Sequence, residues 1–294
     1  TAMDSTLKRM TPGFLRTIGV YTPPAEGGYN PMMAQFGGGG ARKEYRAFNQ
    51  KVAENYNTQS VDLKDGVISS DIDVLVLAAP KDLDEKQLFA VDQFLMQGGT
   101  VILATSPVGV NRQQRSFVSE NYTSGMQEWL AHHGVEIPKE LVLDMQNTGF
   151  PSMRKRVIQG ITIREPYLAP YPFFVDLRGE QLNEDSGITS GLGQLTMAWP
   201  SPLIIDKDKN KDRKTTVLLS SSEKSWRSSD INIEPNSAYA PLGFPVGKEQ
   251  KASTLAAVIE GRFESYFKGK ESPLIEVSEE ASKDDKESND AEAK

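Results

Sequence analysis

The chain has 294 residues, 38% of them hydrophobic, so it is long enough to bury a full core as one large or two modest domains. The formal net charge is -7, and the segment from Glu276 to Lys294 carries eight acidic residues against three lysines, so no basic field recruits nucleic acid. The absence of cysteine excludes disulfides, thiolate zinc sites and thiol nucleophiles.

The first predicted elements are a strand over residues 16–22 (RTIGVYT), a helix from about Ala41 to Tyr56 and a short strand over 59–63 (QSVDL). Gly37 to Gly40 precede the helix, as in loops that hold phosphate at a helix N-terminus. Their spacing fits neither GxGxxG nor the Walker motif, so we interpret them as a surface loop and exclude a P-loop ATPase. The predicted core face of the helix consists of Tyr45, Phe48, Val52 and Tyr56.

Residues 71–107 contain the clearest pattern, a strand, a helix and a strand. DVLVLAAP and TVILATSP run apolar without alternation, which is typical of strands buried on both faces of a parallel sheet. Asp84 with Gln87 predicts a capping box at the start of the helix, and Gly98 and Gly99 predict its end.

A further helix (MQEWLAHH) is predicted after Ser124, ended by Gly134, and a strand over Leu141 to Gln146. This alternation favours an α/β fold with an open, mostly parallel sheet and flanking helices. After Asn147 the patterns GITIREPY, YPFFVDL, LTMAWPSPLIID and TTVLLSSS predict a β-richer half, while STLAAVIEGRFESYF fits a strand or a helix. We therefore expect an α/β part over 1–146, a β-richer part over 147–269 packed on the same domain, and an acidic disordered tail or linker over 270–294.

In open α/β sheets, ligands bind beyond the carboxyl ends of the strands. The polar residues at these ends are therefore the candidate binding residues, and with about one such residue per loop they indicate a binding surface more than a catalytic site. They are Tyr21, Thr22, Lys81, Thr105 and Ser106.

Aromatic residues in the second half are a further candidate for ligand binding, because flat rings can stack on sugars. Trp226 is the ring that we add to the candidate binding residues, and ordinary core packing is the alternative interpretation. The other members of the group are Tyr167, Tyr171, Phe173, Phe174 and Trp199.

We predict no catalytic residue, metal site or cofactor. His132 and His133 are adjacent on a predicted helix and point about 100° apart, so they do not share one metal. No GxSxG motif is present. The segment from Asp206 to Asp212 has the alternating oxygen ligands of a calcium loop, but Lys211 replaces its glycine and Val217 its bidentate glutamate. A polar turn is the favoured interpretation, with weak calcium binding as the alternative.

The segment DVLVLAAPKDLDEKQLFAVDQFLMQGGTVILATSPV closely resembles the signature of the auxiliary component of an ABC-type transport system, in the gliding-motility GldG-like family. WLAHHGVEIPKELVLD, SSSEKSW and AAVIEGRFESYFKGK are similar to later parts of that family. The family frequently has an acidic residue where this chain has Ser106.

The resemblance implies an extracytoplasmic (periplasmic) domain at the inner membrane, anchored by helices outside the given sequence and working with a separate ATPase and permease. It also implies a fold related to class I glutamine amidotransferases, or flavodoxin-like, and a possible saccharide or lipid-linked ligand. Amidotransferase activity is not implied, because these enzymes need a cysteine nucleophile. The alternatives are a hydrolase or amidotransferase-like enzyme using Tyr21, Lys81, Thr105 or Ser106, and a purely structural scaffold.

Overall fold

The computed structural model describes residues 16–23, 45–113, 116–158 and 161–274. They form two compact units, and the chain passes from one unit to the other more than once. Unit 1 comprises Thr1–Thr105, Ser124–Trp129 and Phe263–Lys294, and unit 2 comprises Ser106–Thr123 and Leu130–Arg262. The ranges of the two units alternate along the chain, whereas the sequence patterns suggested consecutive parts. The division at residues 146 and 269 stays a prediction. The glycine run and the end of the acidic tail lie outside the described residues.

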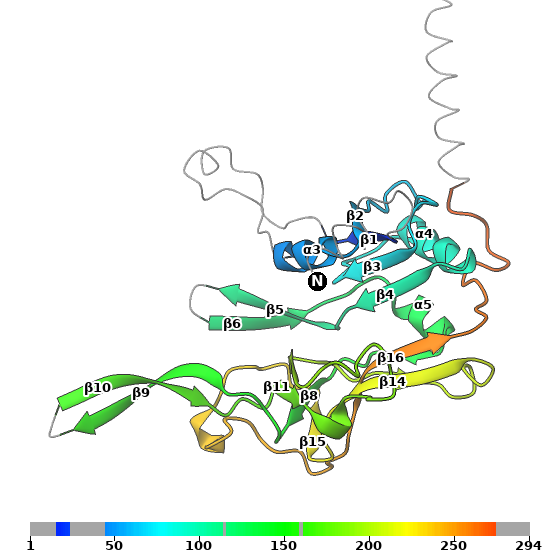
Figure 1. Ribbon diagram of the computed structural model, residues 1–294. Helices are drawn as coiled ribbons and strands as arrows, with labels where there is room; N and C mark the ends of the chain where they lie inside the picture. Colours follow the sequence, from blue (N-terminus) through cyan, green and yellow to red (C-terminus); the bar gives the residue numbers. More distant parts are fainter. Residues whose placement is uncertain (1–15, 24–44, 114–115, 159–160, 275–294) are drawn as a thin grey trace, which may run out of the picture. The chain divides into compact units, whose positions relative to one another are not determined.

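Unit 1 is built on a four-stranded parallel sheet with the order β2-β1-β3-β4 (Figure 1). Residues 74–78 of β3 lie between two partners and are almost completely buried, as their unbroken apolar run predicts. The strand order reverses between β1 and β3. The strands are β1 (Thr17–Tyr21), β2 (Asn57–Ser60), β3 (Val74–Ala78) and β4 (Thr100–Ala104).

The helix α4 (Glu85–Met96) connects β3 to β4, and it begins and ends where the sequence predicts. Asp84 accepts a hydrogen bond from the Gln87 amide (2.8 Å), and the Gln87 side chain accepts one from the Asp84 amide (3.1 Å). Gly98 follows the helix with a φ of 91°, the left-handed conformation that glycine adopts without strain. The capping box and the glycine stop are therefore confirmed.

Two expectations about unit 1 were wrong. Strand β4 is an edge strand whose exposure alternates, with Ile102 50% exposed, because the strand expected beyond it does not join the sheet. The helix α3 (Arg46–Ala53) buries none of its residues, and Phe48 and Tyr56 of the predicted core face are 40% and 45% exposed. Among the described residues, no helix has the length and apolar character that crossing a bilayer requires.

Unit 2 is made of antiparallel strand pairs, in agreement with the predicted β-rich character of the second half. The strand over Leu141–Asp144, expected in the parallel sheet, pairs instead with β15 of unit 2. The pairs are β5 (Val108–Gln113) with β6 (Ser116–Asn121), β7 (Val135–Glu136) with β13 (Ile204–Ile205), β8 (Leu141–Asp144) with β15 (Ser225–Ser228), β9 (Phe150–Ile158) with β10 (Ile161–Ala169), β11 (Phe174–Leu177) with β12 (Leu195–Ala198), and β14 (Lys214–Ser220) with β16 (Thr254–Glu260).

The core of unit 2 lies around β8, whose four residues are all buried. Rings from β15 and the segment before β11 pack on one side of it, in a cluster that holds Tyr171, Phe173 and Trp226. Aliphatic side chains of β11, β14 and β16 form a second cluster around Val142. The short helices are α5 (Gln127–His132), η1 (Gly179–Gln181) and η2 (Ser237–Tyr239).

The sequence patterns resolved some strands of unit 2 less well. The segment LTMAWPSPLIID forms two strands, β12 and β13, because Pro200 and Pro202 interrupt it. The segment STLAAVIEGRFESYF is the strand β16 followed by turns, with no helix. Strands β5, β6 and β9 were not predicted, because their polar residues break the alternation that identifies a strand.

Candidate functional site

The carboxyl ends of β1 and β3 lie side by side in unit 1, since Tyr21 is in register with Leu77. The loop that follows β3 has two non-glycine residues in the left-handed region, Ala79 with a φ of 47° and Asp82 with a φ of 46°. Such conformations persist only where surrounding contacts fix them, and they cluster at ligand sites. This loop, with Lys81 at its centre, is therefore the most unusual backbone at the predicted crevice.

Neighbouring backbone holds this loop in place. The Ala79 amide donates to the Ala104 carbonyl (2.8 Å), and the Leu83 amide donates to the Ser124 carbonyl (3.1 Å). Gly125, with a φ of 77°, allows this approach, because a Cβ there would lie 2.3 Å from the Leu83 carbonyl oxygen. The loop is a rigid feature of unit 1.

The Tyr21 ring is 5% exposed, so it is a buried residue at the edge of the crevice. Burial raises the pKa of the Tyr21 hydroxyl, and the nearby carboxylates of Asp62 and Asp84 raise it further. The hydroxyl therefore stays protonated at neutral pH and is suited to donating a hydrogen bond.

The other candidates of this edge are Thr22, Lys81 and Thr105, all partly exposed. The N-terminus of α4 points into the same loops, but the Asp84 carboxylate already accepts from the Gln87 amide there (2.8 Å). The Asp84 carboxylate already supplies negative charge at this N-terminus, which disfavours a phosphate there. The edge of the sheet thus offers hydroxyl groups and one lysine, with the carboxylates of Asp62 and Asp84 nearby.

The remaining two candidates belong to unit 2. The Ser106 hydroxyl is hydrogen-bonded to the Ser201 hydroxyl (2.9 Å) and accepts from the Val108 amide (3.1 Å), so it stabilises the start of β5. Trp226 is 3% exposed and packs in the core. The rings of Tyr171 and Phe173 are 3% and 1% exposed and pack in the same cluster. These three aromatic residues therefore fit the alternative interpretation, which is core packing.

A buried carboxylate that was not singled out from the sequence joins three distant segments of unit 1. Asp92 of α4 is 0% exposed and accepts hydrogen bonds from the Trp129 indole (3.0 Å), the Ser265 hydroxyl (2.5 Å) and the Tyr266 amide (3.0 Å). Phe89 and Phe267 pack edge to face beside it, with ring centroids 5.1 Å apart. Asp92 therefore attaches the segment after β16 to the helix.

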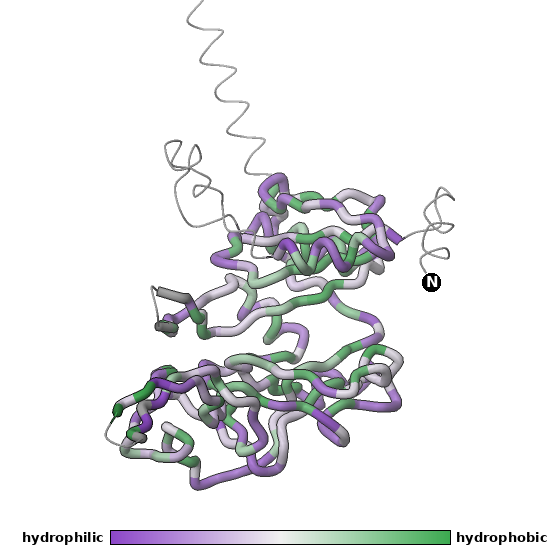
Figure 2. Tube along the Cα trace, turned by 60° about the vertical axis from the view of Figure 1, so that its left-hand side comes forward, coloured by the Kyte–Doolittle hydropathy of each residue, from purple (hydrophilic) through white to green (hydrophobic). Residues whose placement is uncertain are grey.

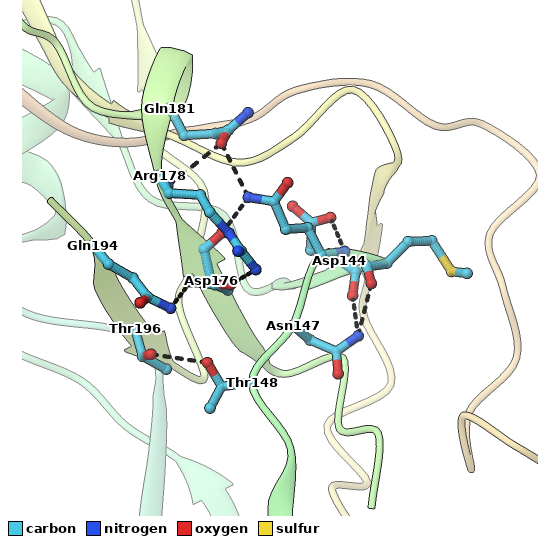
Figure 3. A network of polar contacts seen from close by, with 10 residues as sticks. Asp144, Asn147, Thr148, Asp176, Arg178, Gln181, Gln194 and Thr196 are labelled. Atoms are coloured by element: carbon cyan, nitrogen blue, oxygen red, sulfur yellow. Dashed lines mark hydrogen bonds and ion pairs between the residues drawn. The ribbon is translucent and has the colours of Figure 1, made fainter.

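A second buried carboxylate connects distant segments of unit 2. Asp144 at the end of β8 is 0% exposed, and it accepts from the Ser222 amide (2.7 Å), the Ser222 hydroxyl (2.6 Å) and the Gln146 amide (2.8 Å). Figure 3 shows the polar network that continues from it, where the Asn147 side chain donates to the carbonyls of Asp144 and Met145 (3.0 Å each).

The network extends to a third carboxylate, Asp176 of β11, which pairs with Arg178 and accepts from the Gln194 amide group (2.6 Å) (Figure 3). The Gln146 side chain donates to the Asp176 carbonyl (2.7 Å) and to the Gln181 side-chain oxygen (3.0 Å). These bonds fix η1, which forms one wall of an open groove.

That groove, of about 430 Å³, has two carboxylates and two side-chain amides among its lining residues. No sequence pattern indicated this groove, because its walls come from separate segments, 180–184 and 217–220, and polar side chains in a turn are typical of an ordinary loop. Its lining consists of Glu180, Gln181, Leu182, Asn183, Glu184, Val217, Leu218 and Ser220.

The Asp206 to Asp212 loop is used to end a helix. Lys209 donates to the Ala131 carbonyl (2.7 Å), Asn210 to the Gly134 carbonyl (3.1 Å) and Arg213 to the His133 carbonyl (3.0 Å). The Ala131 carbonyl belongs to the last turn of α5, and His133 and Gly134 follow directly after the helix. The polar turn thus has a structural purpose.

Calcium binding was the alternative interpretation, and two of its four candidate ligands, Asp206 and Asn210, accept hydrogen bonds within that turn. Asp206 Oδ1 accepts from the amides of Asp208 (2.9 Å) and Lys209 (3.1 Å), and Asn210 Oδ1 accepts from Arg213 (3.1 Å). Over the described part of the chain, no group of three or more histidine and acidic residues is placed to hold a metal ion.

The two histidines lie at the same helix end, with ring centroids 5.0 Å apart in an edge-to-face arrangement. His133 is buried and His132 is exposed, so they face different surroundings.

Comparison with known proteins identifies the family. Residues 16–292 match the profile of an auxiliary component described as an ABC-type uncharacterized transport system. The match covers almost the whole chain, and the chain belongs to this family.

The chain is also similar to an uncharacterized protein of Borreliella burgdorferi, with 24% identity over 241 residues. The aligned part is 79% of this chain but only 45% of that relative, so the chain spans less than half the length of the protein it matches. A crystal structure of a ThuA-like protein from Bacteroides uniformis aligns over 71% of this chain and 69% of its own, at 13% identity and a TM-score of 0.38.

Proposed function

We propose that this chain is a non-enzymatic, extracytoplasmic domain of an ABC-2 type transporter, which binds the permease of the system and is anchored by segments outside the given sequence. The family match over residues 16–292 is the observation that carries the proposal. The finer assignment to a GldG-like protein rests on the resemblance of residues 73–108 to that group.

The use of the buried acids supports a binding role over a catalytic one. Asp92 accepts three hydrogen bonds from distant segments, and Asp144 accepts two from Ser222 and one from the nearby Gln146 amide. A general base needs a lone pair directed at substrate, whereas these carboxylates face the interior. Their arrangement supports a rigid platform for a partner.

We further propose that unit 1 is a relative of the class I glutamine amidotransferase and flavodoxin-like folds. Two features support this relationship. The strand order is β2-β1-β3-β4, and the 12-residue helix α4 connects two neighbouring parallel strands, β3 and β4. The absence of cysteine from the sequence separates the chain from the amidotransferase reaction.

Co-purification tests the central proposal. The full-length protein, extracted from membranes in mild detergent, is expected to bring the ATPase and permease with it. Substitution of Lys81 by glutamate, in the rigid loop of unit 1, is expected to weaken that complex, and the exposed Lys248→Glu serves as the matched control. Recovery of the full-length protein alone from an intact membrane fraction would contradict the proposal.

A saccharide or lipid-linked ligand is the second part of the proposal, and the groove beside η1 is where we place it. Carboxylates and amides such as Glu180, Gln181 and Asn183 pair well with sugar hydroxyls. A ligand raises the melting temperature of the state it binds, so a glycan panel read by thermal shift should identify it. Gln181→Ala should remove the shift, and turnover of esters or glycosides by the wild type would favour an enzyme instead.

A further inference from the structure

The hairpin of β9 and β10 differs from the other strands of unit 2. Each of its strands pairs only with the other over nine residue pairs, and Figure 1 shows the outer end of the ribbon away from the other labelled strands of the unit. A two-stranded ribbon is marginally stable in water by itself. A further contact that buries its exposed side chains would therefore stabilise this ribbon.

The outer end of the ribbon exposes an apolar side chain on each of its faces. Val157 is 66% exposed and Ile161 is 68% exposed. Val157 is opposite Thr162, whereas Ile161 is opposite residue 158, and successive residues of a strand point to opposite faces. Val157 and Ile161 therefore extend from different faces of the same end, with Ile163, 38% exposed, on the face of Ile161.

Positive charge follows directly behind this apolar end. Arg156 is opposite Ile163, and Arg154 is opposite Glu165. The Glu165 carboxylate forms ion pairs with both arginines, at 2.6 Å from Arg154 and 3.8 Å from Arg156. Arg164 adds a further cation on the other face. In Figure 2 the segments next to the grey turn of this hairpin are green, and purple segments follow them.

We propose that this hairpin is a membrane-contacting element whose apolar end enters the headgroup region of an anionic lipid bilayer. Arginines exceed carboxylates here in a chain with a formal net charge of -7, so the hairpin is the part whose charge suits an anionic surface. Two to three residues at about 3.3 Å each give a reach of ~7–10 Å, which is the depth of the headgroup and acyl boundary.

The distribution over both faces selects lipid over a protein partner. A protein partner that extends the ribbon by strand addition binds along one edge and leaves the residues on its two faces as they are. Lipid surrounds the end and covers Val157 and Ile161 together. The free edges of the ribbon remain hydrated at this depth, which they would not be in the hydrocarbon core. The inference does not depend on the proposed transporter role, since it requires only this chain and a bilayer.

Vesicle co-sedimentation of the purified 294-residue chain tests the inference. We expect partition into vesicles of phosphatidylcholine with 30% phosphatidylglycerol, weak partition into phosphatidylcholine alone, and release by 1 M salt. Arg156→Gln with Arg164→Gln should weaken binding about 25-fold, at roughly fivefold for each cation. Val157→Ser with Ile161→Ser should weaken it ~10-fold or more.

Matched controls separate the hairpin from general stickiness. Ile188→Ser changes an apolar residue of unit 2 that is 65% exposed, and Lys211→Gln with Lys248→Gln removes two exposed cations elsewhere. Neither control should change the partition, and circular dichroism should show every variant folded. A tryptophan in place of Ile161 should shift its emission to the blue when anionic vesicles are added.

Three outcomes would overturn the inference. These are no partition of the wild type at low salt, equal loss in the hairpin and control variants, and self-association that the Val157 and Ile161 substitutions abolish without any binding to vesicles. The last would assign the ribbon to a second copy of the chain.

Discussion

Individual carboxylates determine how segments far apart in sequence are joined. Asp92 connects α4 to Trp129 and to Ser265, which is 173 residues away. Asp144 makes the corresponding connection to Ser222 in unit 2. Both aspartates lie within segments that match the family, and their hydrogen bonds are internal attachments of the fold.

Asp92→Ala should lower the free energy of unfolding by about 3–5 kcal/mol, because it leaves buried donors of Trp129 and Tyr266 without an acceptor. Asp92→Asn, which keeps one acceptor oxygen, should cost less. Urea denaturation measures both, with the exposed Asp65→Ala as the control, expected within about 0.5 kcal/mol of wild type. A loss below about 1 kcal/mol for Asp92→Ala would show that the attachment matters little.

Tyr171 gives the molecule an alkaline dependence of stability. Burial raises the pKa of its hydroxyl to about 12 in the folded state, although the hydrogen bond from Trp199 lowers it. The unfolded value is about 10, so the folded state holds the proton more tightly. The resulting stability is present below about pH 10 and is lost as pH rises to about 12, an effect of about 2–3 kcal/mol.

Tyr171→Phe should remove this part of the pH dependence, while losing about 1 kcal/mol at neutral pH with the hydrogen bond to the Ile233 carbonyl. Unfolding free energies of wild type and variant, measured from pH 9 to pH 12, give the comparison. Parallel curves would refute the assignment to Tyr171.

At the scale of the element, local signals fix where helices begin and end. The reciprocal bonds of Asp84 and Gln87 start α4, and Gly98 ends it. The end of α5 is different, because carbonyls in its last turn and just after it accept hydrogen bonds from Lys209, Asn210 and Arg213, about 80 residues later. Neighbouring residues in the sequence predict both ends of α4, but they do not predict the contacts at the end of α5.

Asp84→Ala should destabilise the protein by about 1 kcal/mol, the usual cost of losing an N-cap. Gln97→Ala, at the exposed opposite end of α4, is the matched control and should be close to neutral. Equal effects of the two substitutions in urea denaturation would mean that the cap does not stabilise the helix.

Calcium should leave the melting temperature unchanged between a millimolar excess of the ion and a chelator, because the oxygens of Asp206 and Asn210 are already engaged. Asn210→Ala should lower stability by about 1–3 kcal/mol through the uncapped end of α5. Asp208→Ala, whose side chain is exposed, should have little effect. A calcium-dependent rise in melting temperature would revive the metal-loop interpretation.

At the scale of the whole molecule, the two units have separate cores and separate buried acids. Hydrogen exchange should therefore separate them: Asp92→Asn should raise deuterium uptake in residues 85–96 and 263–270, and Asp144→Asn in residues 141–148 and 219–228. A uniform increase over both units from either variant would show that they unfold as one.

What the sequence determined by itself was set by short-range patterns. The unbroken apolar run of β3 predicted its central place in a parallel sheet, and the caps of α4 were confirmed. The family resemblance also came from residues alone, and the match over residues 16–292 confirmed its broader part. The strand and helix signals depend on residues within a few positions of one another.

The remaining features depend on contacts between segments far apart in the chain. The tertiary structure placed Leu141–Asp144 beside β15, made β4 an edge strand, buried Trp226, and formed the groove beside η1 from segments far apart in the chain. Each depends on pairings across tens of residues, whose free energy comes from burial and hydrogen bonds that no local pattern encodes. The exposed hairpin of β9 and β10 is of the same kind, since exposure is defined only once every other strand has found its partner.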